Sequence, residues 1–208
     1  MISKESIFQT ISNILHPLNM CSYATILLCI YTPIIVYPLG LRLFLVVEVF
    51  FYTFVIPVLV IWLLYKLKLI EHYNLRSRKD RILPLVANTL SYAACSLSLA
   101  VQGILPNWAL FSYYGMTVIA FLALLISFWW KISGHAIGLA GLMTASWFYY
   151  FLFRGMFIPL ALPFILLILL GLQCSIRLYL GRHTTAQVYA GCALGIGVMC
   201  ITFWLLMS

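Results

Sequence analysis

Seven long apolar runs fill most of the sequence, and charged residues, prolines or polar residues separate one run from the next. A transmembrane helix needs about 20 consecutive apolar residues, and the runs have this length. The pattern therefore predicts an all-α protein, a polytopic membrane helix bundle with six or seven transmembrane helices, depending on whether the first run spans. The predicted spans are 19–39, 43–67, 83–103, 107–130, 135–153, 156–175 and 185–207.

The overall composition agrees with this pattern. Of the 208 residues, 65% are hydrophobic and 8% are charged, and the mean hydropathy is +1.10, whereas soluble domains carry about 25% charged residues. Because the spans leave little chain for anything else, we expect residues 1–208 to form a single transmembrane domain. Residues 1–18 carry little charge and include His16 and Pro17, which predicts an interfacial helix leading into the first span rather than a cleaved signal peptide.

Basic residues outnumber acidic ones, and the net charge is +8 at pH 7. Half of the twelve basic residues lie in one long polar loop between the second and third runs, namely Lys66, Lys68, Arg76, Arg78, Lys79 and Arg81. Because the basic residues cluster at the ends of apolar runs, the expected partner is the headgroup region of the lipid bilayer, not nucleic acid. The six cysteines lie mostly inside apolar runs without metal-ligand spacing, which predicts small core residues.

Three polar stretches are predicted to emerge on the same face of the membrane. They contain Arg81, His135 and His183, and two spans separate each stretch from the next. Each stretch also stands at the N-terminal end of a predicted helix. Such helix ends present free backbone N–H groups and the positive end of the helix dipole, so three of them directed at one place predict a phosphate-binding site.

Small residues recur at spacings of three or four along the fifth and seventh runs. The fifth run carries Gly134, Gly138, Gly141 and Thr144, and the seventh carries Ala186, Ala190, Gly191 and Gly195. Small residues at this spacing let helix backbones approach closely in lipid. The pattern predicts that these two helices pack together and bring His135 near His183.

The order of these residues resembles that of the type 2 phosphatidic acid phosphatase superfamily, whose members are lipid phosphate phosphatases. Ser133-Gly134-His135 is similar to the family's Pro-Ser-Gly-His stretch, and Arg177-x5-His183 is similar to its Ser-Arg-x5-His-x3-Asp stretch. Lys79 and Arg81 stand where the family has Lys-x6-Arg-Pro. The resemblance implies a phosphatase-like core over residues 76–207 and an integral protein of the bacterial inner membrane.

The chain departs from the family pattern in its first stretch, which reads RSRKDRILP, and at three further positions. Ile132 and Ile176 stand where the family has a proline and a serine, and Gln187 takes the place of the aspartate. A glutamine there is similar to the dolichyl-diphosphate phosphatase-like members, whose motif reads His-Thr-x-x-Gln-Val as the HTTAQV run does. This resemblance favours a polyprenyl diphosphate as the substrate.

The resemblance also implies a role for each site residue. His183 would be the nucleophile that takes the phosphoryl group as a phosphohistidine, and His135 would be the general acid that protonates the departing oxygen. The phosphate of a membrane lipid substrate would be held by Lys79, Arg81, Ser133, Gly134 and Arg177. Phosphoryl transfer depends mainly on positioning and charge neutralisation, so neither a metal nor another cofactor is needed if arginines supply the charge.

Gln187 follows His183 by four residues, a spacing that places two side chains on the same face of a helix. Its amide oxygen could accept the ring N–H of His183 and fix the tautomer. Because an amide carries no charge to stabilise an imidazolium, we predict that Gln187 is a catalytic-site residue that orients His183 rather than activating it.

Other interpretations of the same residues stay open. His183 and Arg177 on their own also fit a membrane-edge cluster that reaches lipid headgroups. The histidine chemistry would equally serve a lipid phosphotransferase, and the missing aspartate would suit a non-catalytic lipid-phosphate binder or transporter. The side of the membrane is open too, because the excess of Lys and Arg on the site's face indicates the cytoplasm while the resemblance implies the opposite face.

Overall fold

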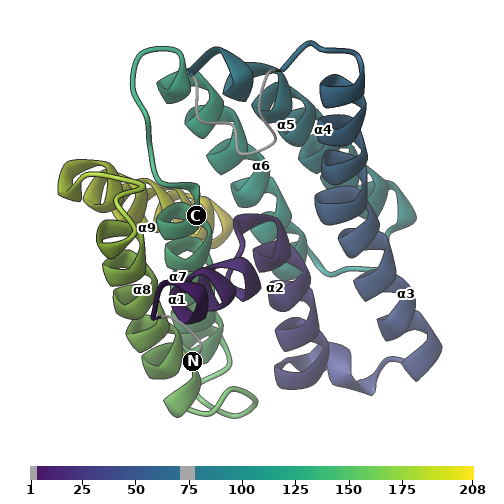
Figure 1. The fold of residues 1–208 in the computed structure, drawn as a ribbon. Coiled ribbons are helices and arrows are strands. Elements are labelled where there is room, and N and C mark those ends of the chain that lie inside the picture. The colour runs from purple at the N-terminus through teal and green to yellow at the C-terminus, as the bar shows by residue number, and fades with distance from the viewer. Residues whose placement is uncertain (1–3, 71–77) are drawn as a thin grey trace.

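The protein is built from helices throughout the part of the chain that the structure describes, as the sequence predicts (Figure 1). The structure is a computed structural model, and it describes residues 4–70 and 78–208. In chain order the elements are α1 (Lys4–Ile14), α2 (Pro17–Tyr31), η1 (Pro33–Val36), α3 (Leu39–Phe50), η2 (Phe51–Val55), α4 (Ile56–Lys66), α5 (Arg78–Gln102), α6 (Asn107–Ser127), α7 (Gly134–Leu152), α8 (Ala161–Tyr179) and α9 (Thr185–Met207). The prediction of an all-α bundle is confirmed.

Five of the described helical segments are long and apolar enough to cross a membrane: Leu39–Lys66, Asp80–Gln102, Asn107–Ser127, Ala161–Tyr179 and Thr185–Met207. The helices α1 and α2 pass the same test together but meet at 54°, so the number rises to six if this bent pair forms one span. The segments are those of an integral membrane protein. The described helices thus provide five or six spans, and the lower of the two predicted numbers agrees with the upper one found.

The helix expected at 135–153 forms as α7 but is not among these apolar segments. Most of its length is buried, including the stretch from Leu139 to Ser146. A helix that contacts protein on its sides does not need the uniformly apolar surface that contact with lipid demands. The sequence therefore predicts this helix correctly, and the structure adds that protein encloses most of its length.

The connection between α2 and α3, which belong to the first two predicted spans, contains a short helix. The helix α2 ends before Thr32, a short η1 follows, and α3 already begins at Leu39. The turn thus covers residues 32–38, and Arg42 lies inside α3, where its Nη1 atom donates a hydrogen bond to the Cys29 carbonyl at 3.3 Å. Pro33 begins η1 and Pro38 directly precedes α3. Each element starts at or directly after a proline because proline lacks an N–H group and is accepted most readily at a helix start.

The segment Leu39–Lys66 contains one turn of π-helix, η2, in its middle. Pro57 has no N–H group to donate to the carbonyl four residues earlier, and the hydrogen-bond ladder shifts, so that the N–H of Ile56 reaches the carbonyl of Phe51. The hydroxyl of Ser91 on α5 donates a hydrogen bond to the carbonyl of Tyr52, within this irregular turn. The break in the helix is therefore tied to α5, and Pro57 lies on the wall of the cavity described below.

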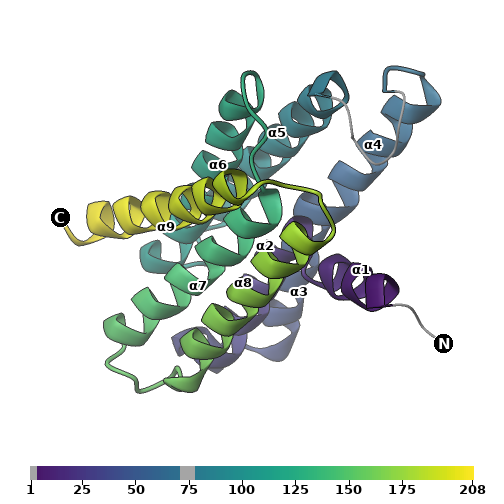
Figure 2. The same cartoon turned by 60° about the vertical axis from the view of Figure 1, so that its left-hand side comes forward.

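The helix α7 lies in the middle of the bundle, with α2, α8 and α9 packed against it (Figure 2). The backbones of α7 and α9 touch: a Cβ atom on Gly195 would lie 2.5 Å from the carbonyl oxygen of Ile137, and one on Gly191 would lie 2.8 Å from that of Ser133. Glycines four residues apart permit this approach. The predicted packing of the two helices is confirmed, and it fixes the start of α7 beside the start of α9.

Two of the α7 glycines, Gly134 and Gly138, contact α2 instead of the predicted α9. A Cβ atom on Gly138 would lie 2.9 Å from Cγ of Met20, and the nearest atom to one on Gly134 belongs to Pro17 at 3.7 Å. These glycines face α2, and the prediction that they pack against α9 is wrong. On α7 the contacts with the two α9 glycines come from Ser133, Ala136, Ile137, Ala140 and Gly141. Ala136 and Ala140 are each two residues from Gly138 and so lie on another side of the helix, which turns by about 100° per residue.

The cysteines are unpaired where the structure describes them, as the sequence predicts. Cys21, Cys29 and Cys95 are buried core residues, whereas Cys200 is exposed. Cys174 on α8 and Cys192 on α9 are half-buried, with 3.7 Å between their sulfur atoms. The expectation of core residues is therefore correct for the three buried cysteines.

Candidate functional site

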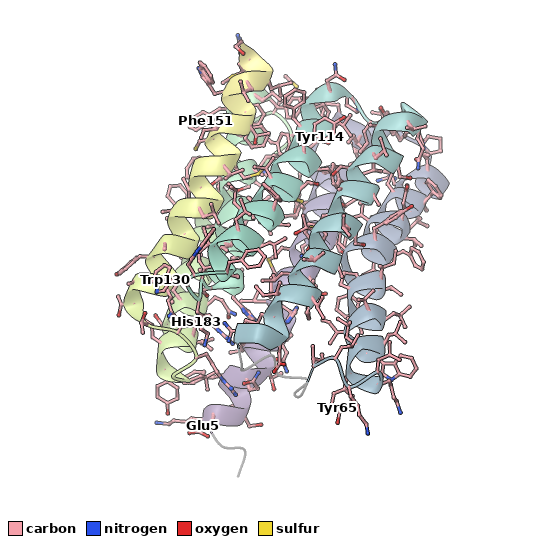
Figure 3. All side chains as sticks on the ribbon, turned by 90° about the horizontal axis from the view of Figure 1, so that it is seen from above. Glu5, Tyr65, Tyr114, Trp130, Phe151 and His183 are labelled. Atoms are coloured by element: carbon pink, nitrogen blue, oxygen red, sulfur yellow. The ribbon has the colours of Figure 1, made fainter. Side chains whose placement is uncertain are left out.

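A cavity of about 700 Å³ lies at the end of the bundle where α2, α7 and α9 begin and α8 ends. Figure 3 shows nitrogen atoms gathered around His183 at this end, far from Phe151 at the opposite end. The basic side chains on the cavity wall are His16, Arg81, Lys131, His135, Arg177, Arg182 and His183. Apolar side chains from the helix interiors line the rest, among them Val58, Ile61, Leu85, Ile119, Leu142 and Met199.

Arg177 reaches the cavity from the last turn of α8, which extends to Tyr179 instead of ending near residue 175 as predicted. Its Nη1 atom donates a hydrogen bond to the hydroxyl oxygen of Ser12 at 3.2 Å. The neighbouring Nε2 atom of Gln173, one turn earlier on α8, donates to the same oxygen at 3.1 Å. The guanidinium group of Arg177 is thus positioned by α1, an element that the sequence did not associate with the site.

His183 lies in the short connection between α8 and α9, two residues before α9 begins. Its Nδ1 atom is 3.2 Å from Oε1 of Gln187, which is the hydrogen bond that the spacing of four predicts. The two residues do not share a helix face, however, because His183 precedes the helix. Gln187 is instead part of a capping box, in which the hydroxyl of Thr184 accepts the Gln187 N–H and the Gln187 side chain accepts the Thr184 N–H.

The surroundings of His183 favour its neutral form. Its pKa is lowered from the ordinary 6.5 to about 4, first by burial and then by the positive charges of Lys131 and Arg177, while the hydrogen bond to Gln187 acts in the opposite direction. The pKa of Lys131 is also lowered, first by burial and then by neighbouring arginines. Near neutral pH the imidazole of His183 therefore carries a lone pair, which a nucleophile requires.

Ser133, Gly134 and His135 form the start of α7, as predicted, with Ser133 as the N-cap residue. Gly134 and His135 line the cavity. Ser133 is 0% exposed, and its hydroxyl has no hydrogen-bond partner among the described residues. Its N–H donates to the carbonyl of Gln187 at 3.3 Å, so Ser133 connects the starts of α7 and α9 from behind the cavity wall.

Arg81 lines the cavity from α5, but it does not precede that helix as predicted, because α5 is already helical at Arg78. The first residue of that helix is three residues before Arg81. The third helix start at the cavity belongs to α2, where Pro17 and Leu18 line the wall. The side chain of Lys79, the other predicted phosphate ligand on this segment, lies outside the described residues.

Three basic residues on the cavity wall were not predicted as site residues: His16, Lys131 and Arg182. The Nδ1 atom of His16 accepts the N–H of Leu18 at 3.3 Å, so His16 caps α2. Its ring meets that of His135 edge to face, with the ring centroids 5.3 Å apart. The available signal was His16 directly before a proline, which is the arrangement of a capping residue at a helix start.

Lys131 and Arg182 belong to the two connections that lead into α7 and α9. The Nζ atom of Lys131 donates a hydrogen bond to the carbonyl of Arg182, which joins the connections to each other. Their position in the sequence could have identified them, because Lys131 lies four residues before His135 and Arg182 directly precedes His183. They raise the positive charge at the polar end of the cavity.

The cavity combines positive charge, neutral imidazole and helix starts. The described residues that line the cavity include three arginines and one lysine, and none of them is acidic. A phosphate is the anion that such a set of donors binds well, because guanidinium groups and backbone N–H groups match its oxygens. A scan against protein-family models and searches of curated proteins and of solved structures found no match to the chain.

Proposed function

We propose that this protein is an integral membrane lipid phosphatase, which hydrolyses a lipid phosphate or a polyprenyl diphosphate through a phosphohistidine intermediate. One observation carries the proposal: His135 and the pair Arg177 and His183, which come from two separate stretches of the sequence, line one cavity. Together with Arg81 they are the residues to which the family resemblance assigns chemistry. The proposed reaction uses no metal.

The hydrogen bond between His183 and Gln187 supports the choice of His183 as the nucleophile. When Nδ1 donates its proton to the amide oxygen of Gln187, Nε2 is left with a lone pair. In the proposed first step His135 enters as the imidazolium form. Nε2 of His183 attacks phosphorus, the bond from phosphorus to the leaving oxygen breaks, and that oxygen takes the imidazolium proton of His135, which becomes neutral. In the second step water attacks the phosphohistidine, the P–N bond breaks, and His135 recovers a proton from the water.

The positive side chains supply the stabilisation that this chemistry requires. Charge spreads over the three equatorial oxygens of the transferred phosphoryl group, and prearranged cations stabilise it without reorganisation. Arg81, Lys131, Arg177 and Arg182 are available on the cavity wall. Removal of one such group is expected to lower turnover by about 100- to 1,000-fold.

The apolar part of the cavity supports a lipid as the substrate. Side chains from α4, α5, α6, α7 and α9 continue the wall beyond the basic groups, as Ile61, Leu85, Ile119, Leu142 and Met199 show. Binding of a hydrocarbon chain there would remove apolar surface from water at about 25 cal/mol per Å². A water-soluble phosphate ester would make no use of this surface.

The test is a phosphate-release assay on purified protein in detergent with a metal chelator present. Lipid monophosphates and diphosphates form the substrate panel, and wild type is compared with His183→Ala and with Arg177→Gln. Arg154→Gln is the matched control, because Arg154 lies in the connection between α7 and α8, away from the described cavity wall. We expect release by wild type and Arg154→Gln, with near-complete loss in His183→Ala.

Two outcomes would decide against the proposal. Wild-type protein that releases phosphate from none of the lipids would favour a non-catalytic lipid-phosphate binder or transporter. Full activity in His183→Ala would exclude the phosphohistidine. A lipid alcohol added to the assay separates hydrolysis from transfer, since a phosphotransferase would produce a new lipid phosphate instead of inorganic phosphate.

A further inference from the structure

The N-terminal helix α1 is largely exposed, yet it contains one fully buried polar residue. Ser12 is 0% exposed, and it is the one buried position in α1. A serine hydroxyl gains little from leaving water unless it finds hydrogen-bond partners, so its burial on an otherwise exposed helix requires an explanation.

The partners of Ser12 provide that explanation. Its hydroxyl oxygen accepts hydrogen bonds from Nε2 of Gln173 at 3.1 Å and from Nη1 of Arg177 at 3.2 Å, which occupy both of its lone pairs. The backbone of Ser12 also forms a hydrogen bond with the ring of His135. One residue of α1 therefore contacts two of the groups proposed to act on the substrate.

Arg177 depends on this contact for its orientation. Its Nε atom is buried and has no hydrogen-bond partner among the described residues. Arginine has a long side chain that loses much rotamer entropy when it is held in one position, and a hydrogen bond to a buried acceptor selects that position. Ser12 itself does not line the cavity, so any effect on an anion must pass through Arg177 or His135.

We propose that α1 is an integral part of the phosphate site and that Ser12 is its positioning residue, holding the guanidinium group of Arg177 toward the bound phosphate. The proposal rests on the function proposed above, because it concerns the same anion. His16, which follows α1 directly, extends the contact by placing its ring against that of His135. The site is incomplete without the N-terminal helix, although the residues that resemble the family's motifs all lie beyond residue 76.

The test is a double-mutant cycle on the full chain, with orthovanadate as the phosphate-like probe. The dissociation constant of vanadate is measured for wild type, Ser12→Ala, Arg177→Gln and the double variant, and the KM and kcat for the best lipid phosphate are measured beside it. Thr10→Ala is the matched control on the same helix, since Thr10 is exposed and its hydroxyl bonds only within α1, to the Ser6 carbonyl. Melting temperature in detergent shows whether each variant is folded.

We expect Ser12→Ala to weaken vanadate binding by about tenfold and to raise KM more than it lowers kcat, because a hydrogen bond to a charged group is lost. The same substitution should have no further effect in the Arg177→Gln background, and Thr10→Ala should match wild type. An equal effect of Ser12→Ala in both backgrounds, or no effect in either, overturns the positioning role. Wild-type protein that neither binds vanadate nor releases phosphate overturns the proposed function itself, and this inference with it.

Discussion

The amide oxygen of Gln187 lies 3.2 Å from Nδ1 of His183 and equally 3.2 Å from the backbone nitrogen of Thr184. One atom thus accepts hydrogen bonds from the proposed nucleophile and from the cap of the helix that follows it. The arrangement explains how a glutamine serves at this position, since an acceptor is needed for both bonds and a charge for neither. It also means that substitutions at this position change two properties, which must be measured separately.

The first prediction separates the effect of Gln187 on the His183 ring from its effect on the cap of α9. Gln187→Ala removes the acceptor for the His183 ring and also one half of the capping box, so we expect kcat to fall about 10- to 100-fold with little change in KM. Both Gln187→Ala and the control Thr184→Ala should lose about 1 kcal/mol of unfolding free energy, because each removes a capping interaction. Thr184→Ala leaves the acceptor for the ring in place and should keep most of its turnover.

Steady-state kinetics and thermal unfolding on the same two preparations check this prediction. If Thr184→Ala lost as much turnover as Gln187→Ala, the effect would come from the helix cap and the orienting role would be wrong.

The second prediction concerns pH. Burial and then the charges of Lys131 and Arg177 hold the pKa of His183 at about 4, so His183 is neutral above this pH and loses its lone pair only below it. A carboxylate in place of the Gln187 amide would stabilise the imidazolium form and raise this pKa. In Gln187→Glu the acid limb of kcat/KM should therefore move to higher pH than in wild type.

The measurement is the ratio of kcat/KM for Gln187→Glu to that for wild type, taken between about pH 5 and about pH 8. Ionisation of the substrate phosphate is common to both proteins and cancels in the ratio. The ratio should fall as the pH decreases, and a ratio independent of pH would show that His183 does not titrate as the nucleophile.

The third prediction concerns His135, which we propose protonates the leaving oxygen. Loss of a general acid slows a reaction by about 100- to 10,000-fold when the leaving group needs a proton, and by much less when it does not. His135→Ala should therefore be strongly impaired with a lipid alkyl phosphate and only mildly impaired with an aryl phosphate whose leaving group is a weakly basic nitrophenolate. Equal loss with both substrates would show that His135 binds phosphate instead.

The fourth prediction tests the contact between α7 and α9 on which the site depends. A Cβ atom on Gly195 would lie 2.5 Å from the carbonyl oxygen of Ile137, whereas one on Gly197, on the same helix, would meet nothing within 4 Å. Gly195→Ala should lower the unfolding free energy by about 1 to 3 kcal/mol through overpacking. Gly197→Ala should be neutral or slightly stabilising, since alanine favours a helix by about 1 kcal/mol over glycine.

Thermal unfolding of the two variants in detergent, followed by circular dichroism, distinguishes them. Phosphate release should fall with Gly195→Ala and not with Gly197→Ala, because the displaced α9 start carries His183 away from His135. Equal melting temperatures for both variants would contradict the close contact.

Several features of the site followed from the sequence because they are local. Ser133 and Thr184 are residue types that favour the N-cap position, so they indicate the two helix starts. The spacing from His183 to Gln187 allows the glutamine side chain to reach back over one helical turn. The spacing of the glycines in the last apolar run likewise predicted the close contact between α9 and α7. In each case the interacting groups are a few residues apart or lie on one helix face.

Other features could not be predicted because they join residues that are distant in the chain. The contact between Ser12 and Arg177 spans 165 residues, and nothing in the exposed sequence of α1 marks its one buried hydroxyl. The helix that packs against Gly138 of α7 could not be predicted either, since a small residue permits a close approach by any neighbouring helix. His16 looked like an ordinary interfacial residue until its ring was placed beside His135.

The sequence by itself determined the helices, their membrane character and the helix starts beside His135 and His183, because hydrophobic length and capping chemistry act within one segment. The tertiary structure alone decided which helices touch, that α7 is enclosed by protein and not by lipid, and that the N-terminal helix closes the site. These choices depend on the packing of surfaces that only the folded bundle brings together, and on the burial of Ser12 against Arg177.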